Sequence, residues 1–139
     1  MSEIAISVII STYNSPEWLA KVLHGYNNQT YQNFEVVIAD DGSKQETIDL
    51  IEAFKKEVFY PITHVWHEDN GFQKSQILNK AIVNCQAAYI LMSDGDCIPR
   101  EDFVEVHFRE REIGYFLSGG YFMLPMDISK AITKESIMN

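Results

Sequence analysis

Short apolar runs alternate with amphipathic stretches along this sequence. Runs of this length that are rich in β-branched side chains are typical of buried strands and are shorter than most helices. They predict strands over Ile4–Ile10, Phe34–Ala39, Ile62–Trp66 and Ala88–Met92, and a longer strand over Tyr115–Leu124.

The stretches between these runs have helical periodicity. The first helix begins near Ser15-Pro16-Glu17, where Ser15 suits the N-cap, Pro16 the first turn and Glu17 the positive end of the helix dipole. Its apolar stripe consists of Trp18, Leu19, Val22, Leu23 and Tyr26. Further helices are predicted over Gln45–Lys56 (inner side Ile48, Ile51 and Phe54 or Lys55), from Gly71 through Ile77, Leu78, Ala81 and Ile82, over Glu101–Glu112, and from about Asp127.

Strands that alternate with helices predict an α/β fold with three layers, α/β/α, around a mostly parallel sheet. The length of 139 residues fits a single domain, or part of one, over residues 1–139. In such sheets, ligands bind at the carboxyl ends of the strands. The polar clusters that follow the predicted strands are therefore expected to line one edge of the sheet: Ser11-Thr12-Tyr13-Asn14, Asp40-Asp41, His67-Glu68-Asp69-Asn70-Gly71 and Ser93 to Asp96.

Composition and net charge limit the classes of protein to which this chain can belong. Hydrophobic residues make up 46% and charged residues 22%, which is ordinary for a soluble globular protein. The net charge of -9 argues against a nucleic-acid partner, because a phosphate backbone requires a basic surface. The two cysteines, Cys85 and Cys97, form no disulfide framework and lack metal-ligand spacing, so free thiols in a reducing compartment are expected.

The sequence contains no apolar segment near the length of a membrane span, and its N-terminus lacks the basic region of a secretory signal. These features predict a cytoplasmic protein. A peripheral association with the inner face of the membrane stays open.

The segment from Tyr89 to Pro99 carries the clearest chemistry. An apolar run leads directly to Asp94-Gly95-Asp96, and side chains at i and i+2 of a strand share one face, so the two carboxylates converge. Converging carboxylates repel each other unless a cation lies between them. Oxygen ligands suit Mg²⁺ or Mn²⁺, which often share their coordination with substrate phosphates. The alternative is an acidic turn, since Asp and Gly are common turn residues.

The other clusters allow both binding and structural roles. Thr12 is free to contact a base or ribose while Ser15 caps the helix. Asp40 and Asp41 accept hydrogen bonds only, so they suit the N–H edge of a base or ribose hydroxyls, or else a turn before a helix. Lys74 lies near a helix start, the less favoured end for a cation, so a carboxylate or phosphate partner is expected.

The segment around the third predicted strand contains two histidines and a turn. His64 and His67 are three residues apart on a strand, so they face opposite sides and are not expected to chelate one metal. Asn70-Gly71 predicts a turn in which Gly71 supplies a positive φ.

Several motifs occur in a distinctive order: Ser7 to Asn14, Val36 to Ser43, Asn70-Gly71 and Ser93 to Asp96. Together they closely resemble the nucleotide-sugar-binding half of family 2 glycosyltransferases, which have the GT-A fold. The resemblance extends from about Ile6 to Phe103, and the combination is far more specific than any one motif. It implies a nucleotide-diphospho-sugar donor, commonly UDP-linked, and a Mn²⁺ or Mg²⁺ cofactor.

The resemblance also implies roles for individual residues. Thr12 and either Asp40 or Asp41 would hold the base and ribose, Lys74 would meet the nucleotide, and Asp96 would ligate the metal that bridges the diphosphate. The implied donor-binding set is Thr12, Tyr13, Asn14, Asp40, Asp41, Asn70, Gly71, Lys74, Asp94 and Gly95, and the implied metal ligands are Asp96 and Asp94. Members of the family generally invert the anomeric centre by direct displacement, and a carboxylate base deprotonates the hydroxyl of a saccharide or lipid-linked acceptor.

The sequence departs from the family pattern after the strand predicted at Tyr115–Leu124. Complete domains of the family are longer, and the acceptor-binding segment with the catalytic base is expected beyond this strand. Asp127 and Glu135 are the only later acids, and neither is assigned as the base. We therefore expect a fragment or a naturally truncated product that binds donor without efficient transfer.

Two other functional classes stay open. A phosphoacceptor signalling domain shares the length and the acidic Mg²⁺ pocket, but it places its acidic pair after the first strand, whereas Asp40-Asp41 follows the second. A sugar-nucleotide-binding module without chemistry of its own fits the short length. Labelling by acetyl phosphate would support the first class. Metal-dependent UDP binding without turnover, even with the natural C-terminal region restored, would support the second.

Overall fold

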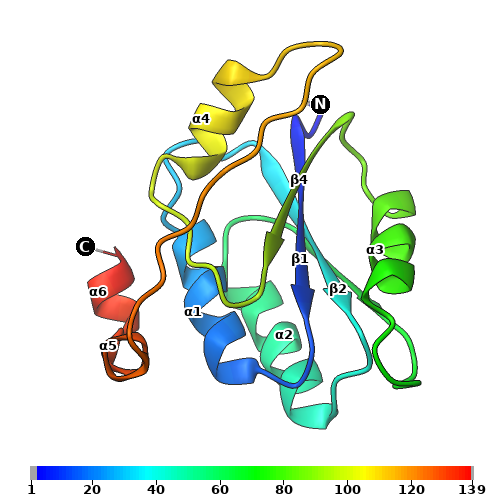
Figure 1. Cartoon of the computed structure of the whole chain (residues 1–139), viewed down its shortest axis with the longest axis vertical. Helices are drawn as coiled ribbons and strands as arrows, with labels where there is room; N and C mark the ends of the chain where they lie inside the picture. The colour runs from blue at the N-terminus through cyan, green and yellow to red at the C-terminus, as the bar shows by residue number, and fades with distance from the viewer. Residues whose placement is uncertain (1–2, 139) are drawn as a thin grey trace.

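The computed structural model describes residues 3–138 and contains a four-stranded sheet (Figure 1). Its strands are β1 (Ile6–Thr12), β2 (Phe34–Asp40), β3 (Ile62–Trp66) and β4 (Tyr89–Asp94), in the spatial order β3-β2-β1-β4. Each pair of neighbouring strands is parallel, which confirms the predicted sheet. Three of the strands end one or two residues later than predicted, so Thr12, Asp40 and Asp94 belong to the strands themselves.

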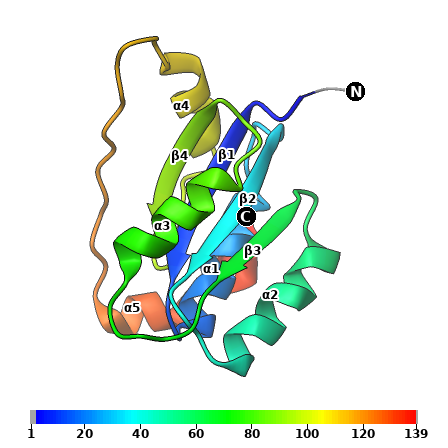
Figure 2. The ribbon, with the colours of Figure 1, turned by 90° about the vertical axis from the view of Figure 1, so that its right-hand side faces the viewer.

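Helices cover both faces of the sheet. Helices α1 (Pro16–Tyr26), α2 (Gln45–Glu57) and α4 (Phe103–Glu110) pack on one face, and α3 (Lys74–Val83) packs on the other (Figures 1 and 2). The predicted three-layer α/β/α arrangement is therefore confirmed. Two short helices, α5 (Met126–Ala131) and α6 (Lys134–Met138), follow, as expected for a terminal helix from about Asp127.

Alternate residues of the central strand contact the two helical layers. Val8 and Ile10 pack toward α1 and α2, whereas Ile9 packs toward Ile77 and Ala81 of α3. All of these side chains are fully buried. Because β1 and β2 are covered on both faces, their sequences are almost continuously apolar until the polar residues at their carboxyl ends.

Two details of the predicted helices are corrected. Ser15 occupies the N-cap of α1, but its hydroxyl donates to the carbonyl oxygen of Tyr13 at 3.0 Å and makes no capping bond. On α2 the buried residues are Thr47, Ile51 and Phe54, and the predicted Ile48 is only half-buried. Lys55 is exposed, and its ammonium pairs with Glu52 at 2.8 Å.

The strand predicted over Tyr115–Leu124 is wrong. The chain between α4 and α5 has no regular secondary structure, and its large side chains are exposed, Phe116 by 89% and Tyr121 by 78%. β4 is the edge of the sheet on that side, and within residues 3–138 no strand pairs with its outer edge. A strand-like sequence forms a strand only where a neighbouring backbone supplies hydrogen bonds.

The last helices lie beside α1 (Figure 1). The Lys21 ammonium donates to the carbonyl oxygen of Ser129 at 2.8 Å, and the Asn28 amide donates to that of Ile137 at 3.1 Å. In the part of the chain that the structure describes, no helix combines the length and apolar character of a membrane span.

Candidate functional site

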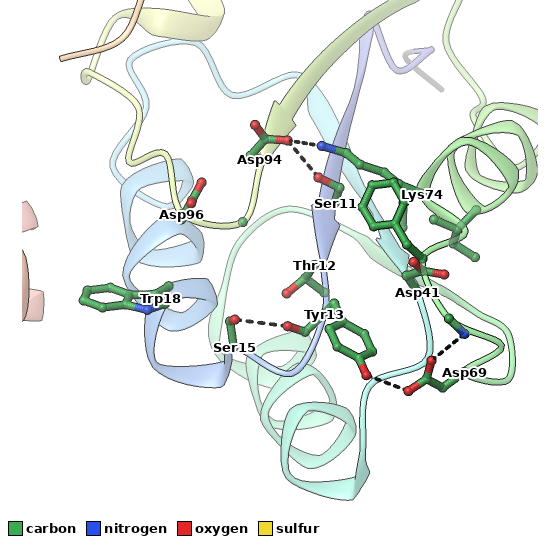
Figure 3. A pocket seen from close by; sticks show the side chains of 15 residues that line it. Ser11, Thr12, Tyr13, Ser15, Trp18, Asp41, Asp69, Lys74, Asp94 and Asp96 are labelled. Carbon is green, nitrogen blue, oxygen red and sulfur yellow. Dashed lines mark hydrogen bonds and ion pairs between the residues drawn. The ribbon is translucent and has the colours of Figure 1, made fainter. Parts of the chain in front are cut away.

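The carboxyl ends of the strands meet at one edge of the sheet. Thr12 is paired with Asp40 and Ser11 with Asp94, so the polar residues after β1, β2 and β4 lie at the same level. There they surround a cavity of about 470 Å³ (Figure 3). The cavity is lined by Ser11, Thr12, Tyr13, Ser15, Trp18, Ala39, Asp41, Asp69, Gly71, Phe72, Lys74, Ile77, Asp94, Gly95 and Asp96. The expectation that the polar clusters line one edge is confirmed.

Most of the residues expected to bind ligand lie in this lining, and three do not. Asn14, Asp40 and Asn70 are absent from it. Asn14 has a φ of 47° and links two loops instead: its N–H donates to the Ser43 hydroxyl at 2.8 Å, and its side-chain oxygen accepts the Lys44 N–H at 2.8 Å.

The structure separates the two adjacent acids after β2. Asp40 is fully buried, accepts the Ser43 N–H at 2.9 Å and lies 2.8 Å from His64 Nε2. Asp41 reaches the cavity, lies 2.6 Å from His67 Nε2 and accepts the Gln73 N–H at 2.9 Å. Of the two acids, only Asp41 lines the cavity, so only Asp41 is placed where it can contact a ligand. The two histidines thus contact different carboxylates, His64 that of Asp40 and His67 that of Asp41.

Asp94 is the last residue of β4 and is already held in place. One of its oxygens accepts the Ser11 hydroxyl at 2.9 Å and the Lys74 ammonium at 3.1 Å (Figure 3). Partial burial by itself would raise the pKa of the Asp94 carboxyl, but the bonds from Lys74 and Ser11 outweigh it and the pKa lies below its usual value. Lys74 therefore has the carboxylate partner that its position near a helix start predicted.

A close approach of the backbone explains the glycine between the two acids. The Gly95 N–H donates to the carbonyl oxygen of Ser11 at 2.7 Å. A Cβ at this position would lie 2.7 Å from the same oxygen and 3.3 Å from Thr12 Oγ1. Glycine thus lets the loop fold tightly against β1, so that Asp94 and Asp96 both face the cavity.

The donor atoms at this loop fit a divalent cation. Asp94, Asp96 and Cys97 offer ligand atoms that all lie within 4.8 Å of one another. The two carboxylates are the oxygen ligands that Mg²⁺ and Mn²⁺ prefer, and the thiol is a softer addition. Cys97 was not among the residues expected from the sequence, although it follows Asp96 directly, and it does not line the cavity.

A polar group without a partner also lines this cavity. Thr12 as a whole is 8% exposed, and its Oγ1 is buried and has no hydrogen-bond partner among the described residues. A buried hydroxyl left unpaired is costly, so a ligand that bonds it gains free energy.

Tyr13 and Asp69 join the loops after β1 and β3 at the mouth of the cavity. The Tyr13 hydroxyl donates to Asp69 at 2.6 Å, and Asp69 also accepts the Gly71 N–H at 3.1 Å (Figure 3). The Tyr13 bond lowers the pKa of the Asp69 carboxyl and raises that of the Tyr13 hydroxyl. Gly71 has a φ of 81°, which confirms the predicted positive value.

Comparison with known proteins identifies the family. The sequence model described as glycosyl transferase family 2 matches residues 7–115, most of the chain. The chain belongs to this family. Glycosyltransferase GlyG of Streptococcus pneumoniae serotype 4 is 31% identical over 110 residues, which are 79% of this chain and 36% of GlyG. The chain thus spans about a third of the length of that relative.

Solved structures of glycosyltransferases show the same GT-A fold. TarS 1-349 of S. aureus in complex with UDP-GlcNAc matches with a TM-score of 0.63 and 22% identity, over 76% of this chain and 31% of that one. The mannosyltransferase PcManGT of Pyrobaculum calidifontis, in complex with GDP-Man and Mn²⁺, also matches with a TM-score of 0.63 and 22% identity, over 71% of this chain and 29% of that one. At this identity the likeness establishes the fold.

Proposed function

We propose that this family 2 chain binds a nucleotide-diphospho-sugar, UDP-linked sugars being the first candidates, together with Mn²⁺ or Mg²⁺. The observation that carries the proposal is that Asp94, Asp96 and Lys74 face the same cavity as Thr12 and Asp41. A cavity of about 470 Å³ suits a ligand of this size. The protein then transfers the sugar to a saccharide or lipid-linked acceptor with inversion, as the family resemblance implies.

The acidic loop and Lys74 form the diphosphate end of the site. Asp94 and Asp96 would hold the cation, and the Lys74 ammonium lies 3.1 Å from Asp94 and would add a positive charge. A chain with a net charge of -9 needs such local cations to accept a diphosphate. When bound, the cation offsets the charge that develops on the departing diphosphate.

Thr12 and Asp41 form the nucleoside end. The carboxylate of Asp41 accepts an N–H of the base, and the unpartnered Thr12 hydroxyl bonds the nucleoside. Phe72 also lines the cavity and is 85% exposed. An aromatic face of this kind gains apolar contact when a planar ring covers it.

We infer that transfer requires a base other than the carboxylates that line this cavity. Each carboxylate of the cavity has a role in the donor site: Asp94 and Asp96 at the cation, Asp41 at the base, and Asp69 in the bond to Tyr13. This leaves none of these acids to deprotonate an acceptor hydroxyl. The donor complexes of TarS with UDP-GlcNAc and of PcManGT with GDP-Man and Mn²⁺ support the choice of ligand class.

A thermal-shift panel tests the proposed function. We expect UDP and UDP-GlcNAc to raise the melting temperature of the 139-residue chain when Mn²⁺ is present, because a ligand that binds only the folded state stabilises it. GDP-Man serves as the comparison for base and sugar, and inorganic pyrophosphate for the diphosphate alone. If no nucleotide shifts the melting temperature under either metal condition, the proposed function is wrong.

Replacing Lys74 by methionine is expected to change the affinities for two ligands in opposite directions. The Lys74 ammonium competes with a bare cation for Asp94 but attracts a diphosphate. Mn²⁺ alone should bind the variant about threefold more tightly, and UDP with Mn²⁺ about tenfold more weakly. Isothermal titration of both ligands measures this, with the exposed Lys56→Met as the charge-matched control. Changes of the same sign for both ligands would contradict the assignment.

A further inference from the structure

A chain of side chains lies behind the nucleoside end of the cavity. The Lys80 ammonium of α3 is 2.9 Å from His67 Nδ1, and His67 Nε2 is 2.6 Å from Asp41 Oδ1. Neither Lys80 nor His67 lines the cavity, whereas Asp41 does. The hydrogen-bonded route from these two residues to the cavity therefore runs through Asp41.

The partners of His67 determine its tautomer. An ammonium group has donors and no acceptor, so Nδ1 must accept the bond from Lys80. The ring proton then lies on Nε2 and is donated to the Asp41 carboxylate. The result is a directed series in which Lys80 donates to His67 and His67 donates to Asp41, and each bond polarises the next.

This series fixes the Asp41 carboxylate at both of its oxygens. Oδ1 accepts from His67, and Oδ2 accepts the N–H of Gln73 at the start of α3. The side chains of His67 and Asp41 are only 12% and 10% exposed, so water competes little for these bonds. A carboxylate has about four acceptor positions, which leaves lone pairs of Asp41 for a donor in the cavity.

The neighbouring pair of His64 and Asp40 provides an internal contrast. These side chains lie 2.8 Å apart, with Asp40 fully buried and outside the cavity lining. His64 lies on β3 and His67 in the loop after it, and each contacts an acid at or directly after the end of β2. Only the acid bonded to His67, Asp41, lines the cavity and can contact a ligand.

We propose that Lys80 and His67 are positioning residues that hold Asp41 as a preorganised acceptor for an N–H group on the base of the bound nucleotide. This inference rests on the proposed function. It separates the two halves of the ligand: the Lys80–His67–Asp41 series governs affinity for the nucleoside and leaves affinity for the diphosphate unchanged.

Binding to Lys80→Met tests this separation. We expect the variant to bind UDP with Mn²⁺ about tenfold more weakly and pyrophosphate with Mn²⁺ as tightly as the wild type. Lys80→Arg should remain within about threefold of the wild type for UDP, because a guanidinium also donates to Nδ1. Lys56→Met controls for the loss of one charge. Equal weakening of UDP and pyrophosphate would indicate a merely structural role and overturn the proposal, as would UDP binding no weaker than in the control.

A double-mutant cycle tests whether Lys80 acts through His67. In the His67→Leu background, Lys80→Met should weaken UDP binding no further. An additional tenfold loss would show an independent action of Lys80 and overturn the proposal.

Nitrogen NMR of the His67 ring tests the geometry without any ligand. We expect a neutral ring with the proton on Nε2 in the wild type, and a shift of the Nδ1 signal toward that of an unbonded nitrogen in Lys80→Met. A proton on Nδ1 in the wild type would overturn the proposal. Because this measurement needs no nucleotide, it distinguishes failure of this inference from failure of the proposed function, which the thermal-shift panel alone decides.

Discussion

Asp96→Ala is expected to abolish the metal-dependent part of nucleotide binding. Asp96 is a ligand of the candidate cation site and, unlike Asp94, makes no bond to Lys74. Its loss removes one of two carboxylates, and the other remains paired with a lysine that repels a cation. We expect the affinity for UDP in the presence of Mn²⁺ to fall about a hundredfold, which corresponds to about 2.7 kcal/mol.

Thermal shift and titration with and without Mn²⁺ measure this effect. The wild type should show a large gain in melting temperature on adding Mn²⁺ to UDP, and Asp96→Ala should show almost none. Asp127→Ala removes an exposed acid of α5 and serves as the control for net charge. If UDP shifts the wild type equally without metal, the assignment of Asp96 as a metal ligand fails.

The position of the site could be predicted because it depends on few features of the chain. Strands buried on both faces are apolar along their length, and the first polar residues mark their carboxyl ends. In a parallel sheet these ends share one edge, so Thr12, Asp41 and Asp94 are brought together whatever the details of the loops. The sequence pattern therefore predicted both the parallel sheet and the cavity at its edge.

The choice between adjacent acids depends on tertiary partners that a linear pattern does not contain. Asp40 is the last residue of β2 and points into the protein, where His64 meets it, whereas Asp41 leaves the strand and reaches the cavity. Both histidines come from a segment more than 20 residues later. Trp18 was assigned only to the apolar stripe of α1, but in the structure it also lines the cavity.

The wrongly predicted strand over Tyr115–Leu124 has a related cause. Alternation and β-branched or aromatic content report how well a segment suits a sheet, and they say nothing of whether a partner edge is available. In the described residues, β4 presents that edge while the segment runs elsewhere, with side chains such as Phe122 87% exposed. The segment has the composition of a strand, but among the described residues it has no neighbouring strand to pair with.

Gly42→Ala is expected to cause the largest loss of stability among substitutions near the site. Gly42 has a φ of 98°, and a Cβ there would lie 2.6 Å from both the Cα and the N of Asp69. The side chain would thus meet backbone that cannot move without shifting the loop after β3, which carries His67 and Asp69. Strain at a positive φ together with this clash should lower the free energy of unfolding by about 3 kcal/mol or more.

Gly71→Ala is the matched control, because it separates backbone strain from the clash. Gly71 has a similar φ of 81°, but apart from Gly71 and its two chain neighbours no described residue has an atom within 4 Å of its Cβ position. Its replacement should cost only the conformational strain, about 1 kcal/mol. Urea unfolding of the two variants measures the difference, which reports how tightly the loop after β2 packs against the loop after β3. Equal losses of unfolding free energy would mean that the two loops can move apart at little cost. The part of the cavity lined by Asp41 and Asp69 would then be less rigid than the close approach at Gly42 implies.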